Sequence, residues 1–137
     1  MGLTVATPMI NEPANTRVVL RIAKNAAMFR SMNRAVLSEL VDGSRHVFYE
    51  SGDVVVSQGD HDSSVYLVLA GRVKVLQGQE GHSDETIAEL GPGEIFGELA
   101  SLETQPRSAT VITLEPTSCM KVSGPEFLAA LRQSPTT

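Results

Sequence analysis

The segment from Gly91 to Val111 contains residue types that could bind an anionic ligand. Gly97 and Glu98 open a Gly-Glu-Leu-Ala-Ser-Leu stretch, which predicts one helical turn whose first backbone N–H groups have no partner inside the helix. Arg107 follows at the expected start of a strand, and a guanidinium is well suited to bidentate contact with a phosphate. The carboxylate of Glu98 would repel a phosphate, but it can accept hydrogen bonds from hydroxyl groups such as those of a ribose. Phosphate donors beside a hydroxyl acceptor indicate a nucleotide site.

The same segment closely resembles the phosphate-binding cassette of cyclic nucleotide-binding domains. The family pattern is Phe-Gly-Glu-Leu-Ala followed, after a short interval, by Pro-Arg-(Ala/Ser/Thr)-Ala-Thr. This chain has Phe-Gly-Glu-Leu-Ala at 96–100 and Pro-Arg-Ser-Ala-Thr at 106–110, and glycine-marked strands upstream also match, at 51–53, 58–60 and 66–75. The resemblance covers residues 29 to 131. It implies a regulatory binding domain of the type found in catabolite activator protein and in the regulatory subunits of protein kinase A.

The resemblance also implies a role for each cassette residue. Glu98 would accept a hydrogen bond from the ribose 2′-hydroxyl, and Arg107, expected to face solvent, would pair with the exocyclic oxygens of a cyclic phosphate. Backbone groups would complete the ligand set, from Gly97, Leu99, Ala100 and Ser108. Alanine at the position of Ser108 is typical of many cAMP sites, while serine occurs in bacterial members that bind cAMP. The expected ligand is therefore cAMP, with cGMP as the alternative, and no further cofactor, metal or catalytic residue is expected.

Two features depart from the family pattern. Ser101 stands where the family often has leucine, at a position that helps to relay ligand occupancy to the C-terminal helix. Members usually also have a further helix that covers the base, whereas the sequence ends at Thr137. We therefore expect this lid to come from a larger parent protein or from another chain. The effector domain or partner protein that the module controls is likewise expected outside residues 1–137.

Short runs rich in β-branched residues, each closed by a glycine, predict the fold class. The expected strands are residues 46–49, 54–57, 65–70, 73–77, 86–90, 108–113 and 118–122. Strands at this spacing predict a mainly β fold with flanking helices, a β-roll or jelly-roll-like antiparallel barrel. A first helix is expected from Thr16, and a second between Asn33 as N-cap and Gly43 as the residue after its end.

These elements predict one folded unit preceded by a leader. Residues 1–15 contain Pro8, Pro13 and mostly small or polar residues, and they are expected to be flexible. Residues 16–137 are expected to form a single cyclic nucleotide-binding domain. Its helices would lie in 16–43, its β-roll in 44–122 and a short C-terminal helix in 123–133, which would follow movement of the cassette.

Composition argues against several classes of function. Sixteen acidic residues against eleven basic ones give a formal net charge of −5, which disfavours a diffuse basic surface for nucleic acid or anionic membranes. Cys119 is the only cysteine, so an internal disulfide framework and a thiolate metal site are excluded. No apolar run reaches the roughly 18–20 residues of a membrane span, and no basic residue precedes Arg17 as it would in a signal peptide. We expect a cytoplasmic protein with no membrane span and no direct nucleic-acid contact.

Two other classes of function compete with a ligand sensor. The first is a fold of the same kind that serves only protein docking with an empty pocket, and retention of both cassette residues, glutamate and arginine, argues against it. The second is a metal enzyme of the cupin type, which would need a close pair of histidines. The histidines are instead scattered, at His46, His61 and His82, and Cys119 is expected to be a buried small residue rather than a nucleophile. We therefore expect no enzymatic activity, and we expect the glycines at 52, 59, 71 and 91 to serve tight turns.

Overall fold

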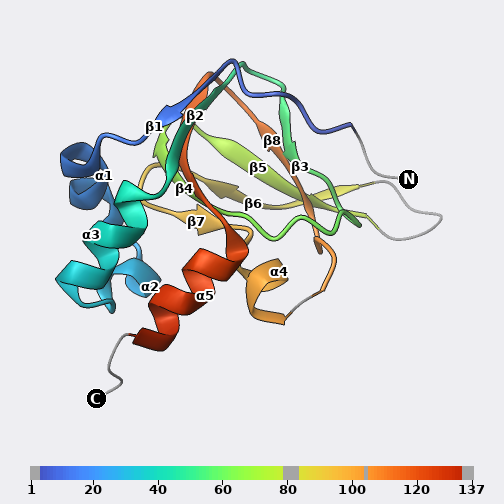
Figure 1. The fold of residues 1–137 in the computed structure, drawn as a ribbon. Coiled ribbons are helices and arrows are strands. Elements are labelled where there is room, and N and C mark those ends of the chain that lie inside the picture. The colour runs from blue at the N-terminus through green and yellow to red at the C-terminus, as the bar shows by residue number, and fades with distance from the viewer. Residues whose placement is uncertain (1–3, 79–83, 104, 134–137) are drawn as a thin grey trace.

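Two antiparallel sheets form the centre of the molecule, and helices cover the outer face of one of them (Figure 1). The computed structural model describes residues 4–78, 84–103 and 105–133. The first sheet has five strands in the order β1 (Ile10–Pro13), β2 (Arg45–Tyr49), β9 (Thr117–Val122), β4 (Val65–Ala70) and β7 (Ile95–Phe96). The second sheet has four strands in the order β3 (Val54–Val56), β8 (Thr110–Thr113), β5 (Val73–Gln77) and β6 (Glu85–Leu90). This is the mainly β roll that the sequence predicts.

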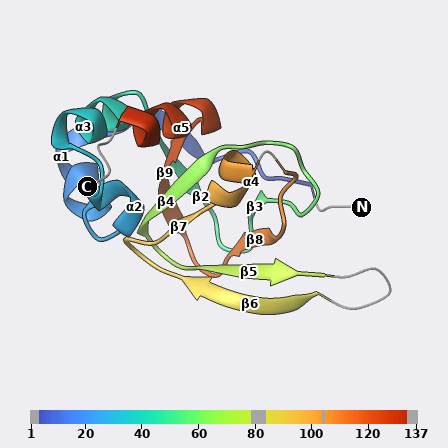
Figure 2. The same ribbon diagram turned by 90° about the horizontal axis from the view of Figure 1, so that it is seen from below.

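Four of the five helices found in the described residues form a layer on the first sheet, opposite β5 and β6 (Figure 2). They are α1 (Thr16–Ala23), α2 (Ala27–Arg30), α3 (Arg34–Asp42) and α5 (Gly124–Gln133). Helix α4 (Glu98–Glu103) follows β7 in the sequence and contacts α5. Asparagine side chains start two of the helices. Asn15 Oδ1 accepts a hydrogen bond from the Val18 N–H at 3.3 Å, and Asn33 Oδ1 accepts one from the Val36 N–H at 3.1 Å. The N-cap expected at Asn33 is therefore confirmed.

Strand β4 belongs to two hydrophobic cores. Val65, Leu67 and Leu69 face the helices, in a core where the rings of Phe29 and Phe127 meet edge to face with centroids 5.9 Å apart. Tyr66 and Val68 point the other way, into the core between the two sheets. Burial on both faces explains why the sequence of this strand is almost continuously apolar instead of alternating.

The structure adds part of the predicted leader to the first sheet. Strand β1 pairs antiparallel with β2, with Ile10 opposite Phe48, and the Ala6 N–H donates to the Val54 carbonyl at 2.8 Å. The sequence of β1 is Ile-Asn-Glu-Pro and all four residues are exposed. Backbone pairing with β2 therefore makes this strand, which is why no alternation of apolar residues announces it.

The helical region also differs in detail from the prediction. Its second expected helix ends at Gly43, but the φ of this residue is −86°, so the chain leaves α3 without the left-handed conformation expected of a glycine there. The short β7 was not predicted, because two residues are too few to show a periodicity.

Candidate functional site

Gly97 joins β7 to α4 in a backbone conformation that favours glycine. Its φ is +88°, in the left-handed region that other residues rarely adopt. A Cβ atom at this position would lie 2.7 Å from Arg107 Nη1 and 2.7 Å from the carbonyl oxygen of Ser64. Gly97 therefore permits both the turn into α4 and the close approach of the arginine.

The guanidinium of Arg107 is buried and bonded to three protein acceptors. Nη1 donates to the Gly97 carbonyl at 3.0 Å, and Nη2 donates to the Ser64 carbonyl at 2.8 Å and to Asp62 Oδ2 at 3.1 Å. The residue is only 4% exposed, so the expectation that it faces solvent is wrong. Carbonyl groups from two loops replace water around the charge, which a local sequence pattern does not reveal. Its Nε is buried and has no hydrogen-bond partner.

Asp62 is a site residue that the sequence analysis missed. It lies 45 positions before Arg107, in the loop between β3 and β4, and it forms the carboxylate side of the ion pair. Burial alone would raise the pKa of Asp62, but hydrogen bonds from Ser64 and the charge of Arg107 outweigh burial and lower it. Asp62 therefore stays ionised and partly neutralises the arginine. A single aspartate in a polar loop gives no signal of this partner.

Glu98 is the first residue of α4, and its carboxylate is half-buried. Burial raises the pKa of Glu98, and hydrogen bonds from the backbone N–H groups of Glu98 and Leu99 and the charge of Arg107 offset this only in part. A carboxylate that is poorly solvated in this way is stabilised when a hydroxyl group donates a hydrogen bond to it.

One cleft with a volume of about 210 Å³ is lined by all six predicted ligand-binding residues, Gly97, Glu98, Leu99, Ala100, Arg107 and Ser108. Within this set Arg107 and Ala100 are buried, while Leu99 is 51% exposed and Ser108 is exposed. The opposite wall is aliphatic and comes from the second sheet, through Val56, Val75, Ile87, Ala88, Leu90 and Val111. A charged end and an apolar end in one cleft suit a ligand with an anionic group and a flat, weakly polar ring.

Ser101 connects α4 to the helical layer. It is 3% exposed, and its hydroxyl donates to the carbonyl oxygen of Gly124, the first residue of α5, at 3.1 Å. The serine that replaces the family's usual leucine thus makes a polar contact between these two helices.

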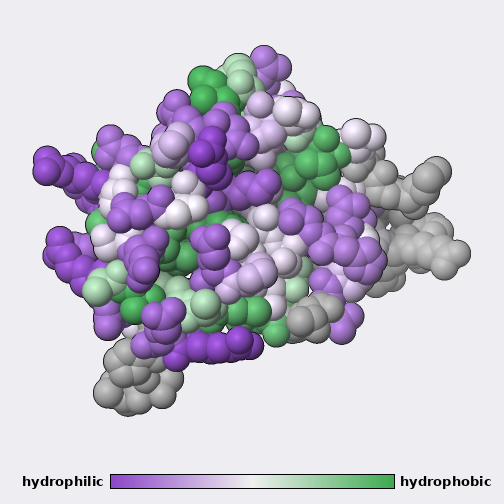
Figure 3. Space-filling view, viewed as in Figure 1, coloured by the Kyte–Doolittle hydropathy of each residue, from purple (hydrophilic) through white to green (hydrophobic). Residues whose placement is uncertain are grey.

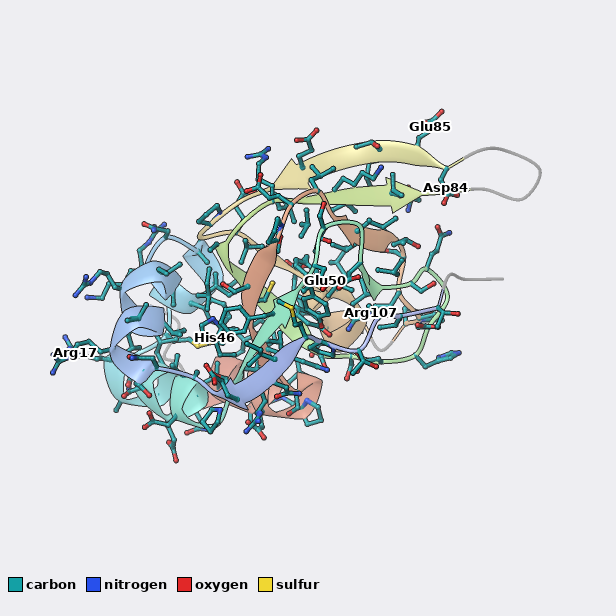
Figure 4. All side chains as sticks on the ribbon, turned by 90° about the horizontal axis from the view of Figure 1, so that it is seen from above. Arg17, His46, Glu50, Asp84, Glu85 and Arg107 are labelled. Atoms are coloured by element: carbon teal, nitrogen blue, oxygen red, sulfur yellow. The ribbon has the colours of Figure 1, made fainter. Side chains whose placement is uncertain are left out.

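The other chemically active side chains lie away from the cleft. Cys119 is fully buried in β9 and its burial raises the pKa of its thiol to about 12, so the expectation of a buried small residue is confirmed. His46 lies in β2, with its ring centroid 4.3 Å from that of Phe48, and Figure 4 shows it apart from Arg107. His61 is exposed, and His82 lies outside the described residues. In the described parts of the chain, no three His, Cys, Asp or Glu side chains gather in a way that could hold a metal ion.

Comparison with known proteins decides the family. The family model for the cyclic nucleotide-binding domain matches residues 46–134, which include the whole cleft. The chain belongs to the cyclic nucleotide-binding domain family. Members of this family are regulatory modules, and the cassette and β-roll described above are the features by which the sequence resembles it.

The similar proteins are longer than this chain. This cyclic nucleotide-binding domain is 38% identical over 105 residues to the Pycsar effector protein XpPycTIR of Xanthomonas perforans, covering 75% of the chain and 33% of that protein. It is 36% identical over 87 residues to the cyclic AMP receptor protein of Thermus thermophilus, covering 64% of the chain and 40% of that protein. The chain therefore spans well under half the length of these relatives.

Solved structures show the same fold. The regulatory domain of Toxoplasma gondii PKA, determined with cAMP, superimposes with a TM-score of 0.80 at 24% identity, covering 84% of this chain and 44% of that one. Within the residues that the structure describes, no helix is long and apolar enough to cross a membrane.

Proposed function

We propose that the cleft between α4 and the second sheet binds a cyclic purine mononucleotide, with cAMP preferred to cGMP. The observation that carries this proposal is the Arg107 guanidinium, which is buried, forms part of the cleft wall and retains an Nε without a partner. A buried donor without an acceptor destabilises the protein, and binding of an acceptor removes this cost. A phosphate oxygen is an acceptor whose charge also matches the arginine.

The remaining cassette residues divide the ligand between them. Glu98 accepts from the ribose 2′-hydroxyl, while backbone groups of Gly97, Leu99 and Ala100 contribute at the start of α4. The aliphatic wall from the second sheet provides the apolar surface for the base. Ser108 is exposed at the edge of the cleft, where its backbone N–H serves the phosphate and its hydroxyl can reach a base substituent.

Ligand occupancy is transmitted through α4 to α5. Ser101 is buried between these helices and donates to Gly124 at 3.1 Å, so a displacement of α4 toward the phosphate acts directly on the first residue of α5. The ligand changes this equilibrium only to the extent that it binds the two arrangements unequally. The domain acts as a non-enzymatic regulator of an effector that is attached to it or binds it.

Isothermal titration calorimetry with cAMP, cGMP, cCMP, cUMP and linear AMP tests the proposal. We expect cAMP to bind most tightly and linear AMP to bind much more weakly. The difference between cAMP and cGMP should stay within about tenfold, because a single neutral hydrogen bond to the base contributes only about 0.5–1.5 kcal/mol. Ser108→Ala should weaken cGMP more than cAMP if the hydroxyl meets the guanine. Tighter binding of a pyrimidine nucleotide would overturn the purine assignment.

One observation favours a second candidate, a docking domain without a ligand. Arg107 already has three protein acceptors, Gly97, Ser64 and Asp62, and these could be its whole role. The same titration separates the two functions. Absence of measurable heat and of any thermal shift with all four cyclic nucleotides would refute the sensor and leave the docking domain as the better-supported function.

A further inference from the structure

Positive charge is concentrated in the N-terminal part of the helical layer. Residues 13–38 contain five basic residues and no acidic one, at Arg17, Arg21, Lys24, Arg30 and Arg34. The rest of the chain has six basic residues against sixteen acidic ones, so the positive charge of a protein with a net charge of −5 is concentrated in this segment. In Figure 3, hydrophilic side chains project from the side of the molecule where Figure 1 shows α1 and α3, and Figure 4 shows Arg17 pointing outward there, far from Arg107.

Helix stability explains the positions of only some of these cations. Arg21 and Arg30 lie in the last turns of α1 and α2, where the helix dipole favours a cation, and Lys24 is the C-cap of α1. The positive end of the helix dipole lies at the N-terminus, where acidic residues are stabilising. Yet α1, α2 and α3 have no acidic residue in their first turns, and Arg17 and Arg34 occupy such positions in α1 and α3. None of the five cations takes part in an ion pair among the described residues, where the pairs are Arg72–Glu89 and Arg107–Asp62. Local choices that work against stability often mark a functional surface.

Three of the cations surround an apolar pocket. This pocket has a volume of about 280 Å³ and is lined by Leu20, Lys24, Arg30, Met32, Arg34 and Leu37. Met32 and Leu37 are only 6% and 5% exposed, so they form its floor, while the three cations are exposed at its rim. Arg30 is held across the rim by a hydrogen bond from Nη1 to the Lys24 carbonyl at 3.3 Å. None of these residues lines the cyclic nucleotide cleft.

We propose that this basic pocket, lined by Leu20, Lys24, Arg30, Met32, Arg34 and Leu37, docks an acidic segment of a partner protein. The segment inserts one bulky apolar side chain into the pocket, and acidic residues on both sides of that side chain contact the rim. The apolar floor and the pocket volume suit a single large side chain, which is how anchor residues fill pockets at protein interfaces. The three rim cations match acidic residues on either side of such an anchor.

The same observations disfavour other anionic partners. Single-stranded nucleic acid binds on exposed aromatic side chains, and the aromatic residues nearest this layer, Phe29 and Phe127, are fully buried. An anionic membrane is bound by apolar side chains that protrude beyond the charges, whereas Met32 and Leu37 lie beneath them. A concave apolar site with a charged rim fits a side chain that enters it.

Titration with short peptides tests the pocket without altering the protein. The probes are the capped peptides Glu-Glu-Phe-Glu-Glu and Glu-Glu-Ala-Glu-Glu, followed by NMR through the methyl groups of Met32, Leu20 and Leu37. We expect only the phenylalanine peptide to shift these methyl signals. We expect its affinity to fall as salt is raised, since exposed charges are screened over about 10 Å at 0.1 M salt.

Variants of the rim cations provide the second arm of the test. Lys24→Gln, Arg30→Gln and Arg34→Gln should each weaken the phenylalanine peptide by roughly two- to fivefold, the range typical of exposed charge pairs. Arg72→Gln is the matched control, because Arg72 is an exposed cation that does not line the basic pocket, and it should leave the affinity unchanged. The variants exchange exposed side chains one at a time, so thermal unfolding should confirm that each remains folded.

Three results would overturn the proposal. One is equal binding of the alanine peptide, which would show that the pocket is not used. Another is that Arg72→Gln weakens binding of the phenylalanine peptide as much as the rim variants do, which would show that only the net charge of the protein matters. The last is binding of phosphatidylserine vesicles or duplex DNA by a protein that ignores both peptides. Failure of this test leaves the cyclic nucleotide titrations unaffected, because the two sites share no residue.

Discussion

Replacement of Arg107 by leucine should damage both ligand binding and the fold. The structure gives the arginine two buried backbone acceptors, Gly97 and Ser64, and one carboxylate, Asp62. Hydrogen bonds from a charged donor contribute about 1.5–3 kcal/mol each, and leucine leaves both carbonyl groups without this partner while recovering part of the loss through its own burial. Since the Asp62 side chain is 55% exposed, it regains water and adds at most about 1 kcal/mol. We expect Arg107→Leu to lower the free energy of unfolding by about 2–4 kcal/mol.

The effect on cAMP binding should be larger in relative terms. Removing the charged partner of the phosphate costs about 2–5 kcal/mol, which corresponds to a loss of affinity of about two orders of magnitude or more at 1.4 kcal/mol per tenfold. Arg107→Lys should recover only part of either loss, because an ammonium keeps the charge but cannot reach all three acceptors with a planar fork.

Urea unfolding followed by circular dichroism, combined with calorimetry in the folded baseline, separates the two effects. Arg72→Leu is the matched control, because Arg72 also pairs with a carboxylate at 3.1 Å but its side chain is 48% exposed. It should change the free energy of unfolding by less than about 1 kcal/mol and leave cAMP affinity unchanged. If Arg107→Leu unfolds like the Arg72 variant, the arginine does not stabilise the fold, and if it also binds cAMP normally, the site is misassigned.

Three further variants test separate parts of the site. Gly97→Ala should weaken cAMP binding by at least tenfold and lower the thermal unfolding midpoint, because φ is +88° and a Cβ would lie 2.7 Å from Arg107 Nη1; normal binding with an unchanged midpoint would contradict this. Burial raises the pKa of Glu98 above 4.5, so the folded state binds a proton on this carboxyl group more tightly than the unfolded state does. Protonation of Glu98 therefore stabilises the fold at low pH, and this stabilisation is lost as pH rises through the raised pKa. The affinity for cAMP should show the opposite pH dependence and fall as pH is lowered through the same pKa. Calorimetry at pH values on both sides of that pKa should show that stability and affinity depend less on pH in Glu98→Gln. Ser101→Ala should change the affinity for cAMP by no more than about threefold, but it should reduce the ligand-induced change in amide hydrogen exchange at α5, since it removes one buried hydrogen bond to Gly124. An unchanged exchange response would exclude transmission from α4 to α5 through Ser101.

The sequence was informative where residues close together along the chain determine the structure. The strands of the roll follow from runs of β-branched residues closed by glycines, and β4 and β5 occupy the residues predicted for them. The six cassette residues were predicted together because they lie within twelve positions of one another, and they do line one cleft. Their contact with a ligand stays a prediction.

The parts that escaped prediction depend on contacts between distant segments. Asp62 reaches Arg107 across 45 positions, and the burial of the arginine depends on the Ser64 carbonyl from the same distant loop. Strand β1 exists because β2 offers it a backbone partner, not because its own residues favour a strand. The run of basic residues at 13–38 was missed for another reason: the sequence shows it, but the net charge of −5 averages over the whole chain.

Strand β4 has a consequence for how the molecule opens. Its side chains alternate between the two cores, so it is a shared wall between the helical layer and the interior of the roll. Loss of either core would expose one face of the strand to water and remove support from the other. The two cores should therefore unfold in a single cooperative step, and the backbone amides of Leu67 and Val68 should exchange with solvent only through global unfolding. The helices that would carry a signal to a partner can shift against β4, but they cannot unfold separately from it without unfolding the nucleotide cleft as well.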